Sequence, residues 1–259
     1  MIRENVMKQG LHEGKKYLGT FIKMTDPSII ELLKYSGFDC VIIDNEHSQM
    51  NKESMANLVR TSDLCGITPV VRVRENSRSM ILQGLDAGAY CIMVPETNTA
   101  EEVSLVISRT KYAPIGDRGY TASQRAAGYG NMDAAEYATF ANENTMTIVY
   151  CETKLALDNL DEMLRVPHLD MMWIGPMDLT QALGVTGNPK HPVVVEAMDM
   201  IIRKSKEANI PVGTIASNVA DAAMLYEQGV QLISLASDQA MIQIMAKQFR
   251  RELKGALDR

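Results

Sequence analysis

Short apolar runs alternate along this chain with longer segments whose apolar residues recur at helical spacing. The clearest short run is 40–44, where three consecutive β-branched residues lead into an acid, a pattern typical of a buried strand. In 52–65, by contrast, Met55, Leu58 and Val59 share one side and Gly66 follows, which predicts an amphipathic helix with a glycine stop. The alternation therefore predicts strands and helices that follow one another in turn.

Strands are predicted in this way at residues 17–23, 40–44, 68–73, 90–95, 145–150, 169–174, 210–215 and 230–235. Helices are predicted at 1–16, 26–37, 52–65, 79–87, 99–110, 133–142, 155–164, 193–208, 219–228 and 238–257. A helix after every strand, in about 250 residues, is typical of a (β/α)₈ TIM barrel. We therefore expect a single α/β barrel domain over 1–259, closed by the helix at 238–257. An open doubly wound sheet is the alternative, but no GxGxxG or P-loop sequence follows an early strand.

The regular alternation breaks at 112–130, which carries four glycines and no clear apolar period. Loops of this length without secondary structure are uncommon inside compact domains and often carry function. We expect a functional loop here, in which Arg118 and Arg125 are candidates for contacts to an anion. A mobile surface insertion is the alternative.

Bulk composition argues against several functions. The chain has 259 residues and a net charge of -6 without a long basic run, which argues against nucleic-acid binding. Its four cysteines are scattered without a CxxC pair, so neither a zinc site nor a disulfide framework is indicated. The first residues lack a secretory signal, and no apolar stretch approaches the ~20 residues that span a bilayer. A cytoplasmic protein without membrane contact is therefore expected.

Ionisable residues follow the predicted strands at the points where those strands stop. In a barrel all these points meet on one face, which is where such folds place their chemistry. One histidine, one arginine and several carboxylates would converge there: Asp44, Glu46, His47, Arg72, Glu96, Glu152 and Asp178. A single acid after a strand is more often a helix cap, so it is the convergence that predicts an active site.

Two of these acids, Glu152 and Asp178, would lie at neighbouring strand ends. Two carboxylates held close repel each other, and a hard divalent cation removes the repulsion while leaving positions open for substrate oxygens. Mg²⁺ or Mn²⁺ is therefore expected, with Co²⁺ or Zn²⁺ as alternatives; an acid/base pair for glycoside chemistry is the competing interpretation. A helix start at Pro176 would point the N–H groups of Met177 and Asp178 at a substrate carboxylate, which suits a 2-oxo acid.

Sequence pieces along nearly the whole chain resemble, in order, the HpcH/HpaI family of class II, metal-dependent 2-oxo-acid aldolases. The pieces are GFDCVIIDNEH (37–47), VVRV (70–73), LDAGA (85–89), IMVP (92–95), RGY (118–120), CET (151–153), IGPMDLT (174–180) and GNPKHP (187–192). The resemblance implies a phosphoenolpyruvate/pyruvate-type barrel in a homohexamer, or a smaller homo-oligomer, often with a helix exchanged between partners. It also implies a lyase that cleaves or forms a 4-hydroxy-2-oxo acid, with pyruvate and an aldehyde as small-molecule partners and a metal-stabilised pyruvate enolate between them.

The resemblance also implies roles for single residues. His47 matches the general acid/base, and Arg72 matches the residue that stabilises charge on the developing oxyanion. Asp86 matches the acid that raises the basicity of this histidine, although strand-end position alone nominates Asp44. Asp44 is then expected to act as a supporting hydrogen-bond partner, and Glu46 to matter less than its place suggests. Glu152 and Asp178 match the metal ligands, and Met177 and Asp178 match the backbone site for the substrate carboxylate.

The chain departs from the family pattern near the expected site, at 48–50 directly after His47 and at two single positions. Tyr150 stands where a substrate-holding Gln is usual, and its phenol can still donate one hydrogen bond to the substrate. Glu96 replaces a residue that is usually apolar, and a charge facing the pocket there would disfavour a dianionic substrate. Two alternatives stay open. One is an acyl-CoA lyase of the citrate-lyase β-subunit type, which needs a basic entrance formed by Arg118 and Arg125; the other is a non-catalytic, aldolase-like barrel that binds a metabolite.

Overall fold

The computed structural model describes residues 3–258, and its centre is a closed barrel of strands β1 to β8 in sequence order. All neighbouring strands pair in parallel, and β8 pairs back onto β1. The bounds are β1 (Tyr17–Ile22), β2 (Cys40–Asp44), β3 (Thr68–Arg72), β4 (Cys91–Val94), β5 (Met146–Cys151), β6 (Met171–Ile174), β7 (Val212–Ala216) and β8 (Leu232–Ser237). The predicted (β/α)₈ barrel is confirmed, and the open doubly wound sheet is wrong because this sheet closes on itself.

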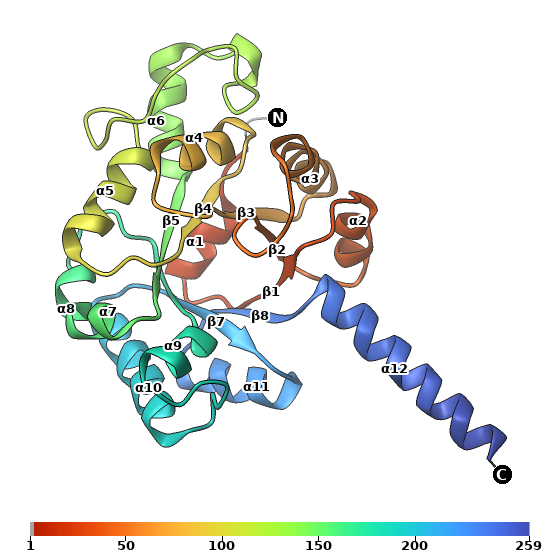
Figure 1. Cartoon of the computed structure of the whole chain (residues 1–259). Coiled ribbons are helices and arrows are strands. Elements are labelled where there is room, and N and C mark those ends of the chain that lie inside the picture. Colours follow the sequence, from red (N-terminus) through yellow and green to blue (C-terminus); the bar gives the residue numbers. More distant parts are fainter. Residues whose placement is uncertain (1–2, 259) are drawn as a thin grey trace.

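Helices form a ring outside the strands (Figure 1). They are α2 (Ser28–Tyr35), α3 (Lys52–Cys65), α4 (Arg78–Asp86), α5 (Ala100–Thr110), α6 (Ala134–Asn144), α7 (Lys154–Asp158), α8 (Leu160–Met163), α9 (Pro176–Ala182), α10 (Pro192–Glu207) and α11 (Val219–Gln228), with a 3₁₀ turn at Gly128–Gly130. The remaining helices, α1 (Val6–His12) and α12 (Asp238–Leu257), are placed differently. Among the described residues, no helix is long and apolar enough to cross a bilayer.

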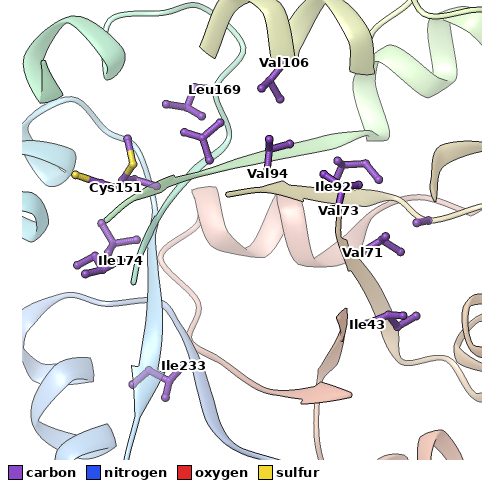
Figure 2. Close-up of a cluster of buried hydrophobic side chains, with 14 of the residues drawn as sticks. Ile43, Val71, Val73, Ile92, Val94, Val106, Cys151, Leu169, Ile174 and Ile233 are labelled. Carbon is purple, nitrogen blue, oxygen red and sulfur yellow. The ribbon is translucent and has the colours of Figure 1, made fainter. Parts of the chain in front are cut away.

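Two apolar layers fill the fold, one on each side of the strands. The outer layer joins strands to helices, and Figure 2 shows part of it, with Ile92 and Val94 of β4 near Val106 of α5. The inner layer fills the barrel with alternate strand residues such as Ile42, and it includes Met7 and Leu11 of α1. Since α1 precedes β1, it lies at the N-terminal end of the barrel and packs against that inner layer. The C-terminal end of the barrel is left for polar side chains.

The C-terminal helix α12 has the predicted bounds but does not close the barrel of its own chain. It projects away from the barrel in Figure 1, and Asp238 at its start is its only buried residue among those described. Large apolar side chains stay exposed along it: Ile242, Ile244, Met245, Phe249, Leu253 and Leu257. A helical apolar period indicates a buried face, and here none of residues 3–258 buries it.

Candidate active site

Asp44 and Arg72 form a buried ion pair at the C-terminal end of the barrel. The register of β2 and β3 places them side by side. Asp44 is fully buried, and it accepts hydrogen bonds from Arg72 Nε at 3.0 Å and Nη2 at 2.8 Å. Burial alone would raise the pKa of Asp44, but the hydrogen bonds and charge of Arg72 outweigh it and lower that pKa. Asp44 is therefore an anion that holds Arg72, which is the supporting place expected from the sequence.

Arg72 is surrounded by groups that keep it charged and fix its direction. Its Nη1 lies 2.7 Å from Glu46 Oε2 and donates to the Tyr150 hydroxyl at 3.3 Å. Its guanidinium carbon stands 4.7 Å from the centre of the Phe21 ring. Burial acts to lower the pKa of Arg72, but Tyr150 and the acids Asp44 and Glu46 raise it above its ordinary value. A permanent, oriented cation therefore stands at this end of the barrel.

Glu46 contacts both Arg72 and His47, which the sequence did not predict. Besides its ion pair with Arg72, its Oε2 lies 3.8 Å from His47 Nε2. Burial raises the pKa of Glu46, and the charges of Asp44 and Asp178 add to the rise, against the opposing effects of Arg72 and His47. We expected Glu46 to matter little, and the structure contradicts this. Its carboxylate contacts both Arg72 and His47, the two residues expected to act on the substrate.

His47 stands at the mouth of the barrel, and its side chain is 61% exposed. The turn that carries it is held by Asp44 Oδ1, which accepts the backbone N–H groups of Glu46 at 3.0 Å and His47 at 3.1 Å. Because the backbone is fixed while the imidazole faces solvent, His47 can exchange protons with a bound molecule or with water.

Glu152 is a buried carboxyl group whose ionised form is disfavoured by its surroundings. It follows β5, is 6% exposed, and accepts the backbone N–H of Glu96 at 2.8 Å. Burial is the main cause that raises the pKa of Glu152 to about 8; the charges of Asp178 and Glu46 add to the rise, and the Glu96 N–H and Arg72 oppose it. A bound cation would replace the proton that this environment favours.

Gly175 lets the Glu152 side chain lie directly against the backbone that precedes Asp178. A Cβ atom on Gly175 would lie 2.5 Å from Glu152 Oε2, so a side chain there would collide with that carboxylate; it would lie 3.4 Å from Asp178 Oδ2, which is an ordinary contact. Within residues 3–258, no three His, Cys, Asp or Glu side chains form a complete metal site. Two neighbouring carboxylates fit Mg²⁺ or Mn²⁺, which commonly take their other ligands from water and substrate.

Tyr150 is buried inside the barrel, whereas Met177 is exposed to solvent. Tyr150 points into the barrel, is 1% exposed, and accepts a hydrogen bond from Arg72 through its hydroxyl. Burial raises the pKa of this phenol above its ordinary value, so it stays protonated. Met177, in the first turn of α9 and next to Asp178 in the sequence, is exposed. The structure thus places Tyr150 under Arg72, where it supports the guanidinium, and leaves contact with the substrate as a prediction.

The structure does not bring Asp86 to His47. Helix α4 begins after the C-terminal end of β3 and runs back to the start of β4, so its last residue, Asp86, lies at the opposite end of the barrel. The Asp86 carboxylate accepts a hydrogen bond from Arg118 Nη2 at 3.3 Å. Strand-end position alone could not have nominated Asp86, and within one chain it does not act on His47.

The loop at 112–130 is packed rather than open. It follows α5, so it starts at the N-terminal end of the barrel, away from the carboxylates. Arg118 pairs with Asp86 and stands 4.6 Å from the centre of the Tyr112 ring, while Arg125 pairs with Asp63. Since both arginines are neutralised at the far end, the basic entrance needed by an acyl-CoA lyase is not formed there, and the expected anion contact is wrong for this chain alone.

Sequence reasoning missed three contributors at the site, Lys23, Gly175 and the backbone of Glu96. Lys23 had a signal, because it lies two residues after the inward-facing Phe21 and strand residues alternate sides. Its Nζ lies 3.6 Å from Asp44 Oδ2. The hydrogen bond from the backbone N–H of Glu96 to Glu152 could not be predicted from the sequence, because every residue type except proline has this backbone donor.

Replacing Asp44 by Ala should lower the free energy of unfolding by about 3 kcal/mol, because it leaves the charge of Arg72 buried without its main partner. Urea denaturation followed by circular dichroism measures the loss. Asp161→Ala is the control, since Asp161 is exposed and pairs with Lys204 at 2.7 Å on the surface, where such a pair adds little. Equal stability losses for the two variants would contradict the structural role of Asp44.

Comparison with known proteins gives consistent matches over most of the chain. The model of a family described as HpcH/HpaI aldolase/citrate lyase matches residues 17–243. The chain is 33% identical over 238 residues to a 2-dehydro-3,6-dideoxy-6-sulfogluconate aldolase of Pseudomonas putida, covering 92% of each. It is 34% identical over 235 residues to a 2-keto-3-deoxy-L-rhamnonate aldolase of Salmonella gallinarum, covering 90% of this chain and 87% of the other. A crystal structure of an HpcH/HpaI aldolase/citrate lyase family protein from Burkholderia cenocepacia superposes with a TM-score of 0.92 at 28% identity, covering 96% of this chain and 99% of that one.

Proposed function

The chain belongs to the HpcH/HpaI aldolase/citrate lyase family, and we propose that its residues Arg72, His47, Glu152 and Asp178 cleave a 4-hydroxy-2-oxo acid to pyruvate and an aldehyde. It is a carbon–carbon lyase of the aldolase type. The observation that carries the residue assignment is the buried Glu152 beside Asp178, at the same barrel end as the oriented cation Arg72.

Glu152 and Asp178 would hold a divalent cation, with Mg²⁺ or Mn²⁺ preferred and Co²⁺ or Zn²⁺ as alternatives. When bound, the cation supplies positive charge that polarises the 2-oxo carbonyl. The donor set supports this, because burial and the neighbouring acids Asp178 and Glu46 raise the pKa of Glu152, and both Glu152 and Asp178 lie against Gly175. Backbone N–H groups at Met177 and Asp178 are the proposed contacts for the substrate carboxylate, as the family resemblance implies.

Arg72 and His47 would divide the chemistry at the bond that breaks. In cleavage, His47 removes the proton of the C4 hydroxyl, directly or through water, and the electrons of the C3–C4 bond move to the 2-oxo carbonyl. Arg72 donates hydrogen bonds to the C4 oxygen as it becomes the aldehyde oxygen. Asp44 and Glu46 keep the guanidinium in place throughout. Return of a proton to C3 yields pyruvate.

A direct test runs the reaction as a condensation. The protein is mixed with pyruvate, Mn²⁺ or Mg²⁺, and acetaldehyde, glycolaldehyde or lactaldehyde, and the 4-hydroxy-2-oxo acid is detected by mass spectrometry. We expect a product with at least one aldehyde and none after EDTA. Failure with all three aldehydes and both metals would argue for the non-catalytic, metabolite-binding alternative.

Assembly into a homo-oligomer is part of the proposal. The apolar side chains of α12 are exposed in one chain, and a helix exchanged between copies would bury them. Asp86 would then act on His47 only across a contact between two copies, since one chain keeps the two residues at opposite barrel ends. A hexameric state and a cytoplasmic location stay predictions from the sequence.

Charged residues on the exposed face of α12 should break this assembly. The double variant Phe249→Glu with Leu253→Glu should have a smaller molar mass than the unaltered protein in size-exclusion chromatography with light scattering, because burying the new carboxylates is unfavourable. Gln243→Glu is the control, since it adds a charge next to Lys247, which already bonds residue 243 at 3.0 Å. An unchanged mass in the double variant would contradict the role of α12.

A further inference from the structure

Glu46 stands between the arginine and the histidine of the active site. Its Oε2 atom lies 2.7 Å from Arg72 Nη1 and 3.8 Å from His47 Nε2. The Glu46 side chain is 18% exposed, whereas the His47 side chain is 61% exposed. A largely buried carboxylate therefore lies beside an imidazole that is otherwise open to solvent.

The position of Glu46 is fixed at both ends of the residue. Its backbone N–H donates to Asp44 Oδ1 at 3.0 Å, and its carboxylate pairs with Arg72. Turning the side chain away from His47 would break the ion pair with Arg72. The Glu46 carboxylate is therefore held next to the imidazole.

Arg72 keeps other partners if Glu46 is lost. Asp44, which is fully buried, accepts hydrogen bonds from its Nε at 3.0 Å and its Nη2 at 2.8 Å. The Tyr150 hydroxyl accepts another from Nη1 at 3.3 Å. Within residues 3–258, by contrast, Glu46 is the only acid that pairs with the His47 side chain.

The charges around Glu46 show how it acts on His47. Burial raises the pKa of Glu46, and the charges of Asp44 and Asp178 add to the rise. The charges of Arg72 and His47 oppose it. Interaction between two titratable groups is reciprocal, so a carboxylate that is stabilised by a charged imidazole stabilises that charged imidazole in turn.

Other charged groups at this end of the barrel are engaged elsewhere. Lys23 pairs with Asp44 at 3.6 Å, and Glu152 accepts the backbone N–H of Glu96 at 2.8 Å. Both act on His47 only at longer range than Glu46 does.

We propose that Glu46 is a positioning residue for His47, whose carboxylate orients the imidazole and strengthens it as the base that takes the C4 hydroxyl proton. Because Nε2 faces Glu46, Nδ1 is the nitrogen left to receive this proton. The proton leaves the C4 oxygen and bonds to Nδ1, and the positive charge that forms on the imidazole is attracted by the carboxylate. The inference rests on the function proposed above, in which His47 moves this proton.

Nuclear magnetic resonance of the imidazole Cε1–H signals tests the inference without any substrate. The chain has four histidines, and the His47 signal is identified by its absence in His47→Ala. With Mg²⁺ present, the midpoint of the His47 titration should fall by about half to one pH unit in Glu46→Gln. The glutamine amide can still accept from Arg72 but has no charge. Glu46→Asp should keep most of the midpoint, and Glu53→Gln, at an exposed position in the first turn of α3, is the control.

The same change should appear in the cleavage of the 4-hydroxy-2-oxo acid formed in the condensation test. kcat/KM falls at acid pH as the base is protonated, and in Glu46→Gln this fall should lie about half to one pH unit lower, with a plateau reduced about tenfold. A role limited to holding Arg72 would reduce the plateau without moving the acid limb or the titration midpoint.

The outcomes separate this inference from the proposed function. An unchanged His47 midpoint in Glu46→Gln would overturn the role of Glu46 and leave the aldolase function standing, and so would a shifted midpoint with an acid limb that does not move. Absence of turnover in the unaltered enzyme would remove the proposed function and, with it, the role of Glu46 in proton transfer.

Discussion

Glu152→Gln is expected to lower metal-dependent turnover about a thousandfold or more. Glutamine keeps the shape of the side chain and can still accept the N–H of Glu96, which bonds Glu152 at 2.8 Å, but it has no charge to offer a cation. Loss of the cation removes several kcal/mol of stabilisation from the transition state, and each ~1.4 kcal/mol is a factor of ten in rate. Steady-state kinetics and Mn²⁺ titration calorimetry on the same variant measure turnover and affinity.

The matched control for this variant is Glu162→Gln, which makes the same change at an exposed position of α8. It should leave both turnover and Mn²⁺ affinity as they are. If Glu152→Gln bound Mn²⁺ as tightly as the unaltered protein, Glu152 would not be a metal ligand, and the buried carboxylate would need another explanation.

His47→Ala should slow turnover about 10²- to 10⁴-fold, the range in which a positioned general acid/base contributes. The loss should come with little change in stability, because the imidazole is 61% exposed and the backbone N–H bond to Asp44 remains. Rate measurements and urea denaturation of the same variant separate the two effects. His12→Ala, at the exposed end of α1, is the control. A turnover rate within about twofold of the unaltered enzyme would remove His47 from the chemistry.

Much of the fold could be predicted because strand and helix periods are local properties of the chain. The strand Cys40–Asp44 and the helices Lys52–Cys65, Val219–Gln228 and Asp238–Leu257 have the predicted bounds. Each is limited by a strong signal, such as Asn51, whose side chain accepts Ser54 N–H at the start of α3, and Gly66 in the left-handed region at its end. One helix predicted at 155–164 is instead two, divided at Asn159, whose side chain donates to Asn98 O.

The parts of the fold that could not be predicted depend on which surfaces meet. The apolar residues of α12 recur at helical spacing, which predicted that the helix closes the barrel. That spacing shows that one face is apolar, but it does not show which surface covers this face. The loop at 112–130 carries arginines, and nothing in its own residues tells that Asp63 and Asp86 lie beside it at the far end of the barrel. Contacts between segments distant in the sequence decided both cases.

The same distinction holds for the active site. Arg72 and Glu152 could be placed on one face because a parallel barrel brings all its strand ends together. Their partners could not be assigned, since Glu46 reaches Arg72 through a turn geometry, and Asp86 was chosen by resemblance although the helix that carries it ends on the other side. The residues at the strand ends could be predicted. Which of the neighbouring acids contacts Arg72 and which contacts His47 could not.

Exchange of the pyruvate methyl protons in D₂O tests the central claim most directly, because it reports the donor half of the reaction without any choice of aldehyde. The signal is followed by NMR with the unaltered protein and Mg²⁺ or Mn²⁺, then after EDTA, and then with Glu152→Gln. We expect loss of the methyl signal that depends on the cation, stops with EDTA and is absent in the variant. A methyl signal that persists with every divalent metal, or exchange that continues unchanged in EDTA and in Glu152→Gln, would contradict the proposed function.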